Sequence, residues 1–150
     1  MVAQGVYQCR CGCRYLSGPR QADYVKGGWN YTGDAYLQDV DGYFFYQSRT
    51  DDMIISAGYN IAAVEVEDVL LRHEAVAECA VIGVPSDEAG EIPKAFVVLR
   101  GSATAEEIIA YVASRVAPHA KIRAVEFVDA IPKSPSGKIL RRELRRRINT

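Results

Sequence analysis

The sequence predicts an α+β fold in which a short central sheet is flanked by helices. Of its 150 residues, 49% are hydrophobic and 25% are charged, the composition of a globular protein rather than of a disordered or collagen-like chain. Two continuous apolar runs, Val76–Val84 and Ala95–Leu99, are typical of buried strands. Other segments repeat apolar residues at helical spacing. Strands and helices do not alternate as a regular βαβ series, so a doubly wound parallel sheet is not expected.

The N-terminal third is predicted to be irregular and then to form a β-hairpin. The first 30 or so residues show no sustained hydrophobic period. Two aromatic, β-prone runs follow, Ala35–Val40 and Tyr43–Ser48. They flank Asp41-Gly42, a pair that readily adopts the positive φ of tight hairpin turns.

The remaining hundred residues combine short strands with three helices. Val64–His73 has acids early and bases late, which suits the helix dipole. Thr104 and Glu107 form a capping-box signature that opens a helix through Val116, and a last helix is predicted at Ile139–Ile148. The predicted strands are Met53–Ser56, Val76–Val84, Ala95–Leu99 and Ala124–Val128, with a turn over residues 57–60 and a polar loop at Pro85–Pro93.

Charge is unevenly distributed, although the formal net charge is only -1. Residues 51–91 hold ten acidic residues and one basic residue, whereas residues 121–150 hold nine basic and three acidic residues. The acidic stretch is interpreted mostly as solvated surface, and the arginines of the last helix mostly as its solvent-exposed face. A nucleic-acid partner is not expected, because the basic helix has neither aromatic platforms nor a reading motif beside it.

The cysteines and the hydropathy favour a cytoplasmic protein without a metal site. Cys9, Cys11 and Cys13 form a C-x-C-x-C run, but no second ligand pair completes a zinc site, so they are interpreted as reduced thiols of undefined role. Cys79 lies in an apolar stretch and is predicted to be a core residue. No apolar run is long enough to span a membrane, and the N-terminus lacks the pattern of a secretory signal.

Two segments could carry chemistry. In the loop Pro132–Lys138, two prolines and Gly137 constrain the backbone, so Lys138 is presented on a stiff tip where an ammonium suits an anionic oxygen. A lysine at such a turn is otherwise most often simply solvent-facing. Asp34 and Arg49 border the hairpin and could together bind a ribose diol and phosphate, or be an ordinary turn aspartate and edge-strand arginine.

In this order, the segments resemble the AMP-forming acyl- and aryl-CoA synthetases of the adenylate-forming superfamily. The resemblance covers roughly residues 14–148, and the ordered set is far more specific than any single motif. The matching segments are Gly28–Asp34, Asp41–Phe44, Ser48–Ile61 and Pro132–Ile139. Within the superfamily, the sequence around Tyr24–Asp34 and Ser56–Ile61 is most similar to benzoate- and 2-aminobenzoate-CoA ligases.

The resemblance implies a two-step reaction and a set of roles. Carboxylate and ATP form acyl-AMP and pyrophosphate, and the thiol of CoA then displaces AMP, with magnesium accompanying ATP. Lys138 would be the catalytic residue of adenylation, Asp34 and Arg49 would bind ATP, and Asp51 would be the hinge. The CoA channel would be lined by Ser56, Ala57, Gly58 and Tyr59.

The resemblance also implies a division of the chain and a missing partner. Residues 1–50 would be an irregular lead-in and the terminal hairpin of the large N-terminal domain, and residues 51–150 the small, mobile C-terminal (lid) domain. Because the acyl pocket belongs to the large domain, the chain alone is expected to be inactive and completed in cis or in trans. Which carboxylic acid is activated cannot be read. The alternative is a non-catalytic interaction or regulatory protein with the same fold, and the exposed hairpin predicts possible homo-oligomers.

Overall fold

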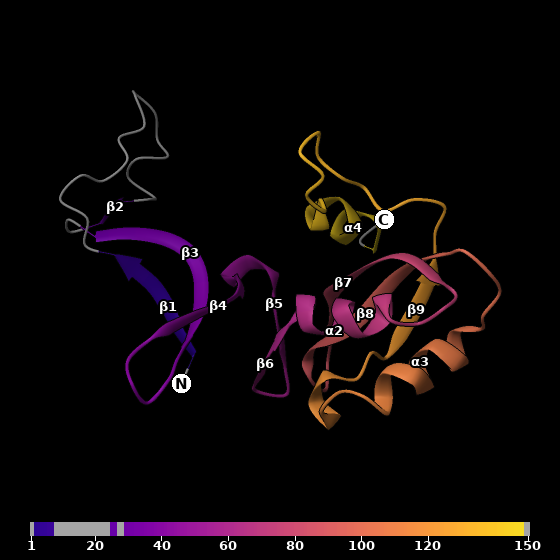
Figure 1. Cartoon of the computed structure of the whole chain (residues 1–150), viewed down its shortest axis with the longest axis horizontal. Helices are drawn as coiled ribbons and strands as arrows, with labels where there is room; N and C mark the ends of the chain where they lie inside the picture. The colour runs from indigo at the N-terminus through magenta and orange to yellow at the C-terminus, as the bar shows by residue number, and fades with distance from the viewer. Residues whose placement is uncertain (1, 8–24, 27–28, 149–150) are drawn as a thin grey trace. The chain divides into compact units, whose positions relative to one another are not determined.

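The computed structural model describes residues 2–7, 25–26 and 29–148, and Cys9, Cys11 and Cys13 lie outside these residues. The chain divides into two compact units, Met1–Asp51 and Asp52–Thr150 (Figure 1). The boundary predicted from the sequence lay between residues 50 and 51. Among the described residues, no helix is both long and apolar enough to cross a membrane.

The first unit is an antiparallel sheet centred on β3. Its strands are β1 (Val2–Tyr7), β2 (Val25–Lys26), β3 (Trp29–Gln38) and β4 (Phe44–Arg49). β1 pairs along one edge of β3, and β2 and β4 pair along the other. The structure confirms the predicted hairpin as β3 and β4.

The prediction that the first 30 residues are irregular was wrong for β1, for β2 and for the start of β3. β1 pairs with a strand far away in the sequence, with Val2 opposite Leu37 and Tyr7 opposite Asn30. A strand whose hydrogen-bond partner is distant needs no strong hydrophobic period of its own, so local pattern does not reveal it.

The second unit contains the helices. Its elements are β5 (Met53–Ser56), β6 (Tyr59–Ala62), α2 (Ala63–Leu71), β7 (Val76–Ser86), β8 (Gly90–Leu99), α3 (Ala105–Ala113), the 3-10 turn η2 (Pro118–Ala120), β9 (Ala124–Phe127) and α4 (Arg141–Ile148). The 3-10 turn η1 (Thr50–Asp52) spans the boundary between the units. The sheet order is β6-β5-β8-β7, and β9 runs parallel to β8. The predicted α+β arrangement, a short sheet flanked by helices, is confirmed.

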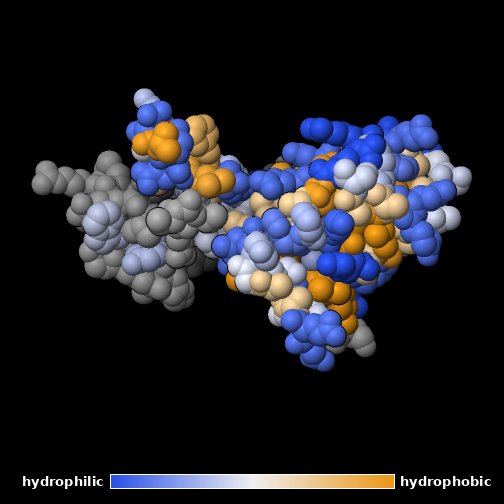
Figure 2. All heavy atoms as spheres, turned by 90° about the horizontal axis from the view of Figure 1, so that it is seen from below, coloured by the Kyte–Doolittle hydropathy of each residue, from blue (hydrophilic) through white to orange (hydrophobic). Residues whose placement is uncertain are grey.

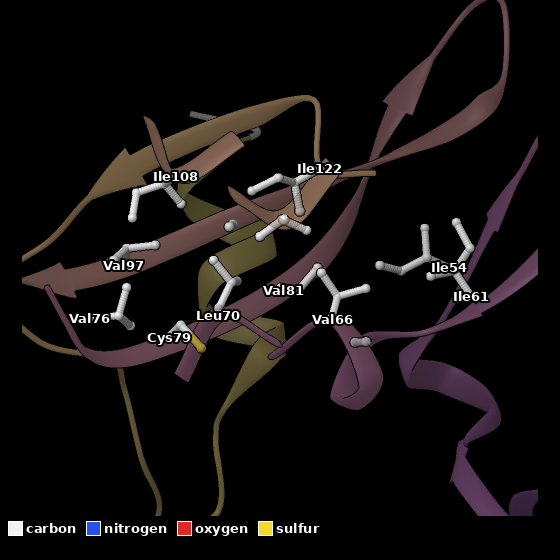
Figure 3. Packing of buried hydrophobic residues seen from close by; sticks show 13 residues of the cluster. Ile54, Ile61, Val66, Leu70, Val76, Cys79, Val81, Val97, Ile108 and Ile122 are labelled. Carbon is white, nitrogen blue, oxygen red and sulfur yellow. The ribbon is translucent and has the colours of Figure 1, made fainter. Parts of the chain in front are cut away.

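Both faces of the β7–β8 pair are buried, and alternate residues enter two different cores. Cys79, Val81 and Val97 join the cluster that α2 and α3 cover, where Val66, Leu70 and Ile108 also lie (Figure 3). The intervening residues Ala80, Ile82 and Phe96 face the second cluster with Leu144 of α4. Burial on both faces explains why these strands are continuously apolar in the sequence.

The largest differences from the predicted elements of the second unit concern β7–β8, β6 and α4. β7 and β8 continue through the predicted polar loop to a tight turn, and Ser86 pairs with Gly90. β6 was missed, because the turn after β5 needs only Ala57 and Gly58. α4 begins at Arg141, since Ile139 forms a β-bridge with Lys133 instead of joining the helix.

Replacing Leu70 by alanine should destabilise the second unit by about 2–5 kcal/mol, because Leu70 is fully buried between α2 and the sheet. Its neighbour Leu71 is 48% exposed, so Leu71→Ala should cost no more than about 0.5 kcal/mol. Urea unfolding followed by helical circular dichroism measures both, because the described helices lie in this unit. Equal losses for the two variants would contradict the described packing.

Cys79 should be unreactive toward thiol reagents in the folded protein. Burial, and then the charges of Glu67 and Asp68, raise the pKa of its thiol from 9.0 to about 12, against an opposing effect of Arg141. The unfolded thiol ionises near 9.0, so folding stability from this group is present below that pH and is lost as pH rises toward 12.

A variant with Cys9, Cys11 and Cys13 changed to serine isolates this thiol. At pH 8 its labelling should be slow in buffer and immediate in denaturant, and its free energy of unfolding should decline above pH 9.0 relative to a further Cys79→Ala variant. Immediate stoichiometric labelling in buffer would show that the thiol is accessible.

Candidate functional site

Asp34 and Arg49 face each other across neighbouring strands. They are register partners in β3 and β4, and Arg49 Nη1 lies 3.5 Å from Asp34 Oδ1. The Arg49 side chain is 55% exposed, so it keeps donors free to meet a ligand, while Asp34 is largely covered. The structure therefore brings these two predicted residues together on one sheet.

The backbone around this pair is fastened by short polar contacts. The amide of Asp34 donates to Thr32 Oγ1 at 3.2 Å, and the hydroxyl of Thr50 donates to the carbonyl oxygen of Gly33 at 3.0 Å. A Cβ at Gly33 would lie 3.1 Å from Arg49 Nη2, and the φ of Gly33 is +73°. A side chain at Gly33 would therefore crowd the arginine that pairs with Asp34.

Asp51 lies in η1, at the last position of the first unit. It is exposed, and the second unit begins at the next residue, Asp52. The predicted hinge position therefore coincides with the place where the contacts of one unit end and those of the other begin.

The segment Ser56–Tyr59 is a tight hairpin turn between β5 and β6. Ser56 pairs with Tyr59, and both Ala57 (φ 48°) and Gly58 (φ 81°) have positive φ, as two-residue hairpin loops favour. Positive φ strains an alanine, so neighbouring contacts must hold Ala57 in place. Its amide donates to the carbonyl oxygen of Ala89 at 2.8 Å.

A surface cavity of about 500 Å³ opens beside this turn. Its lining residues are Ser56, Ala57, Tyr59, Ala89, Ile92, Pro118, His119 and Arg123. The rings of Tyr59 and His119 stack with centroids 4.5 Å apart and 10° between their planes. The cavity thus combines aromatic rings with an arginine, a lining that suits a molecule with apolar and anionic parts. His119 and Arg123 were not predicted, because their sequence neighbourhood carries no motif.

Lys138 lies on a closed loop whose base is well fixed. Lys133 and Ile139 form a β-bridge at its base. Ser134 and Lys138 are joined by two hydrogen bonds: the Ser134 amide donates to the Lys138 carbonyl oxygen at 2.8 Å, and Ser134 Oγ accepts from the Lys138 amide at 3.2 Å. Gly137 has φ 81°, which agrees with the conformational freedom expected for it.

The two lysines of this loop differ in their surroundings. Lys133 Nζ pairs with Glu78 Oε2 at 2.9 Å, whereas Lys138 is exposed and has no ion pair within the part of the chain that the structure describes. Lys138 does not line the cavity beside Ser56–Tyr59. Both lysines are thus exposed at the surface, but only the ammonium of Lys133 is paired with an acid in the described residues.

Two charged residues, Arg141 and Glu67, depart from the sequence-based interpretation. Arg141 was assigned to the exposed basic face, but its side chain is only 12% exposed. Its Nη2 donates to both carboxylate oxygens of Glu67 at 2.7 Å, and its Nη1 lies 3.5 Å from Asp52 Oδ2. Sequence reasoning missed this cluster because its members are far apart in the chain. Glu67, interpreted as part of a solvated face, is 7% exposed.

The chain is similar to known ligases in sequence and in structure. Residues 65–138 match the AMP-binding enzyme C-terminal domain. A 4-coumarate–CoA ligase-like protein of Arabidopsis thaliana is 46% identical over 136 residues, which are 88% of this chain and 24% of that protein. A long-chain-fatty-acid–CoA ligase of Bacillus subtilis (strain 168) is 45% identical over 133 residues, 87% of this chain and 24% of that protein.

Solved structures agree with the sequence comparisons. An anthranilate CoA ligase in complex with anthranoyl-AMP matches with a TM-score of 0.83 and 32% identity, covering 99% of this chain and 29% of that one. The chain spans about a quarter of the length of the curated relatives it matches. Residues 65–138 therefore form an AMP-binding enzyme C-terminal domain, and the chain is similar over most of its length to one part of acyl-CoA and aryl-CoA ligases.

Proposed function

We propose that this chain supplies the mobile C-terminal part of an acid–CoA ligase, which converts a carboxylate, ATP and CoA into acyl-CoA, AMP and pyrophosphate. The observation that carries the proposal is the display of Lys138, an exposed ammonium without an ion pair among the described residues, on a loop closed at its base. A fixed cation of this kind suits a step in which two anions must approach each other.

In the first step, Lys138 would contact the acyl carboxylate and the α-phosphate of ATP as the carboxylate oxygen attacks phosphorus. The ammonium would offset the repulsion between these anions and the charge that develops in the transition state. Asp34 would accept hydrogen bonds from the ribose hydroxyls of ATP, and the exposed guanidinium of Arg49 would donate to the ribose and the phosphates.

In the second step, the thiol of CoA would attack the acyl carbon and release AMP. We assign the CoA channel to Ser56, Ala57, Gly58 and Tyr59, and the cavity beside this turn supports that assignment. Between the two steps, a rotation at Asp51 would move Lys138 out of the active site and bring this turn into it. The division of the chain at Asp51–Asp52 supports the hinge, because a rigid-body rotation needs only a few residues to absorb it.

Mg²⁺ is proposed to accompany ATP in this reaction. The described residues contain no group of three or more histidine, cysteine, aspartate or glutamate side chains that could hold a metal ion. In the proposed reaction ATP and CoA are substrates.

The acid is proposed to be aromatic, of the benzoate or 2-aminobenzoate class. This proposal rests on the sequence around Ser56–Ile61 and is supported by the similarity to an anthranilate CoA ligase over 99% of the chain. The 4-coumarate–CoA ligase-like relatives also have a name that refers to an aromatic acid. We place the enzyme in the cytoplasm, where ATP and CoA are available.

A large N-terminal domain, joined in cis or in trans, is the proposed partner. Four consecutive aromatic residues around β4 are more than half exposed, namely Tyr43, Phe44, Phe45 and Tyr46. Exposed hydrophobic residues are visible on the surface in Figure 2. Apolar side chains gathered on a hairpin favour burial against another protein surface. The same observation favours the second candidate, a non-catalytic interaction protein that uses the hairpin to form oligomers.

The 150-residue chain alone should show no detectable CoA ligase turnover with ATP, CoA and aromatic acids, because the acyl pocket and most transition-state contacts would lie in the partner. Adding or fusing the large domain of an aryl-CoA ligase should restore pyrophosphate release and thioester formation. Turnover by the isolated chain would contradict the proposal that the acyl pocket lies in the partner domain. A self-associated chain that the large domain neither binds nor activates would favour the second candidate.

In the complete ligase, Lys138→Ala should reduce adenylation by about 10²–10³-fold, the effect of removing one charge-stabilising donor from a reacting anion. Thioester formation from supplied acyl-AMP should change little. Lys133→Ala is the matched control: it removes an ammonium of the same loop that is already paired with Glu78, and it should leave adenylation within about threefold. Normal adenylation by the Lys138 variant would refute the assignment.

A further inference from the structure

Arg141 is a largely covered cation in a position that stability alone does not explain. It is the first residue of α4, where the helix dipole disfavours positive charge. Its Nε is buried and has no hydrogen-bond partner in the described structure. Buried ion pairs are often no more stabilising than apolar residues of the same size. Such a cluster therefore calls for a role other than holding the fold together.

The ion pairs of Arg141 join three parts of the second unit. Glu67 of α2 accepts both bonds from Nη2 at 2.7 Å, and its Oε1 also accepts from the amide of Val81 in β7 at 2.8 Å. Asp52, the first residue after Asp51, lies 3.5 Å from Nη1. One guanidinium thus connects the start of the unit, the helix α2 with the central sheet, and the start of α4.

Arg141 is also close in sequence to the Lys138 loop. Only Ile139 and Leu140 separate it from Lys138, and the Leu140 amide donates to the carbonyl oxygen of Pro132 at 2.8 Å. Ile131 and Leu144 are buried in the second core cluster and fix the loop base to the sheet. The side chain of Arg141 thus links the start of α4 to Asp52, at the start of the unit.

We propose that Arg141 is a positioning residue that sets the place of Lys138 relative to the hinge. Arg141 forms ion pairs with Asp52 and with Glu67 of α2. If the unit rotates at Asp51, these pairs keep Asp52, α2 and the base of the lysine loop together, so that they move as one rigid body. Lys138 then reaches the reacting phosphate in a defined position, because its distance from the hinge is fixed. This inference rests on the proposed function of Lys138 and Asp51.

The proposal separates the two half-reactions. Adenylation needs Lys138 in place, so it depends on Arg141. Thioester formation takes place after Lys138 has moved away, so it does not depend on where the arginine holds the loop. A purely structural role would lower both half-reactions together.

The double variant Glu67→Gln with Arg141→Leu removes the ion pairs without leaving an uncompensated buried charge. Glutamine keeps an Oε1 to accept from the Val81 amide, and leucine fills the space of the arginine stem. Its urea midpoint should stay close to that of the wild-type chain, whereas Arg141→Leu alone leaves Glu67 buried and unpaired and should lower the midpoint. The matched control is Arg142→Leu, since Arg142 is exposed on the same helix.

In the complete ligase, the double variant should lose about tenfold or more in the rate of adenylation and keep thioester formation from acyl-AMP within about twofold. The control should be normal in both. Restored stability together with normal adenylation, or equal losses in both half-reactions, would overturn the proposal.

A measurement on the 150-residue chain is independent of catalysis. The backbone ¹⁵N order parameter of Asp52 should fall from about 0.85, the value of rigid backbone, toward about 0.6 in the double variant, while the order parameter of Val81 is unchanged. An unchanged order parameter of Asp52 would refute the positioning role of Arg141 even if the rate of adenylation fell. If the order parameter of Asp52 falls as expected but the wild-type ligase does not adenylate at all, the proposed function is wrong, whereas the link between Arg141 and Asp52 is supported.

Discussion

The second unit depends on the burial of both faces of the β7–β8 pair. Because alternate side chains enter opposite cores, neither strand can shift its register by one residue without exchanging the two apolar sets. α2 and α3 close one face and α4 closes the other. Every candidate functional segment of this unit is attached to that fixed pair: the Ser56–Tyr59 turn at its Gly90 end, and the lysine loop through Ile131 and Leu144.

The candidate residues of the second unit lie on turns whose shape is set by hydrogen bonds to the backbone. Ala57 and Gly58 have positive φ, and the amide of Ala57 is held by Ala89; Gly137 has positive φ, and Ser134 closes its loop. Such turns are exposed yet ordered. A reactive group on an exposed, ordered turn can meet a substrate without first paying the entropy of fixing its own backbone.

The local sequence pattern correctly predicted the helices and strands that depend on short-range interactions. The helix α3 was predicted from its capping box, and Thr104 and Glu107 indeed bond each other's backbone amides. Hairpin β3–β4 was predicted from Asp41-Gly42, although only Gly42 of this pair has a positive φ and the connection runs from Asp39 to Tyr43. β1 was missed because its partner strand β3 lies far along the chain, with Val2 opposite Leu37. The end of β7–β8 was interpreted as a polar loop, although backbone pairing continues there to Ser86 and Gly90.

The same distinction applies to the candidate site. Motif spacing predicted Asp34, Arg49 and Lys138, and the structure pairs the first two across β3 and β4. It could not predict that Arg141 turns inward, because helical periodicity places the apolar Leu144 and Ile148 on the buried face and the arginines on the other face. What turns Arg141 inward is Glu67, 74 residues earlier in the chain. Two acids that pair with one arginine can outweigh its low hydropathy, so helical periodicity assigns a largely buried arginine of this kind to the wrong side.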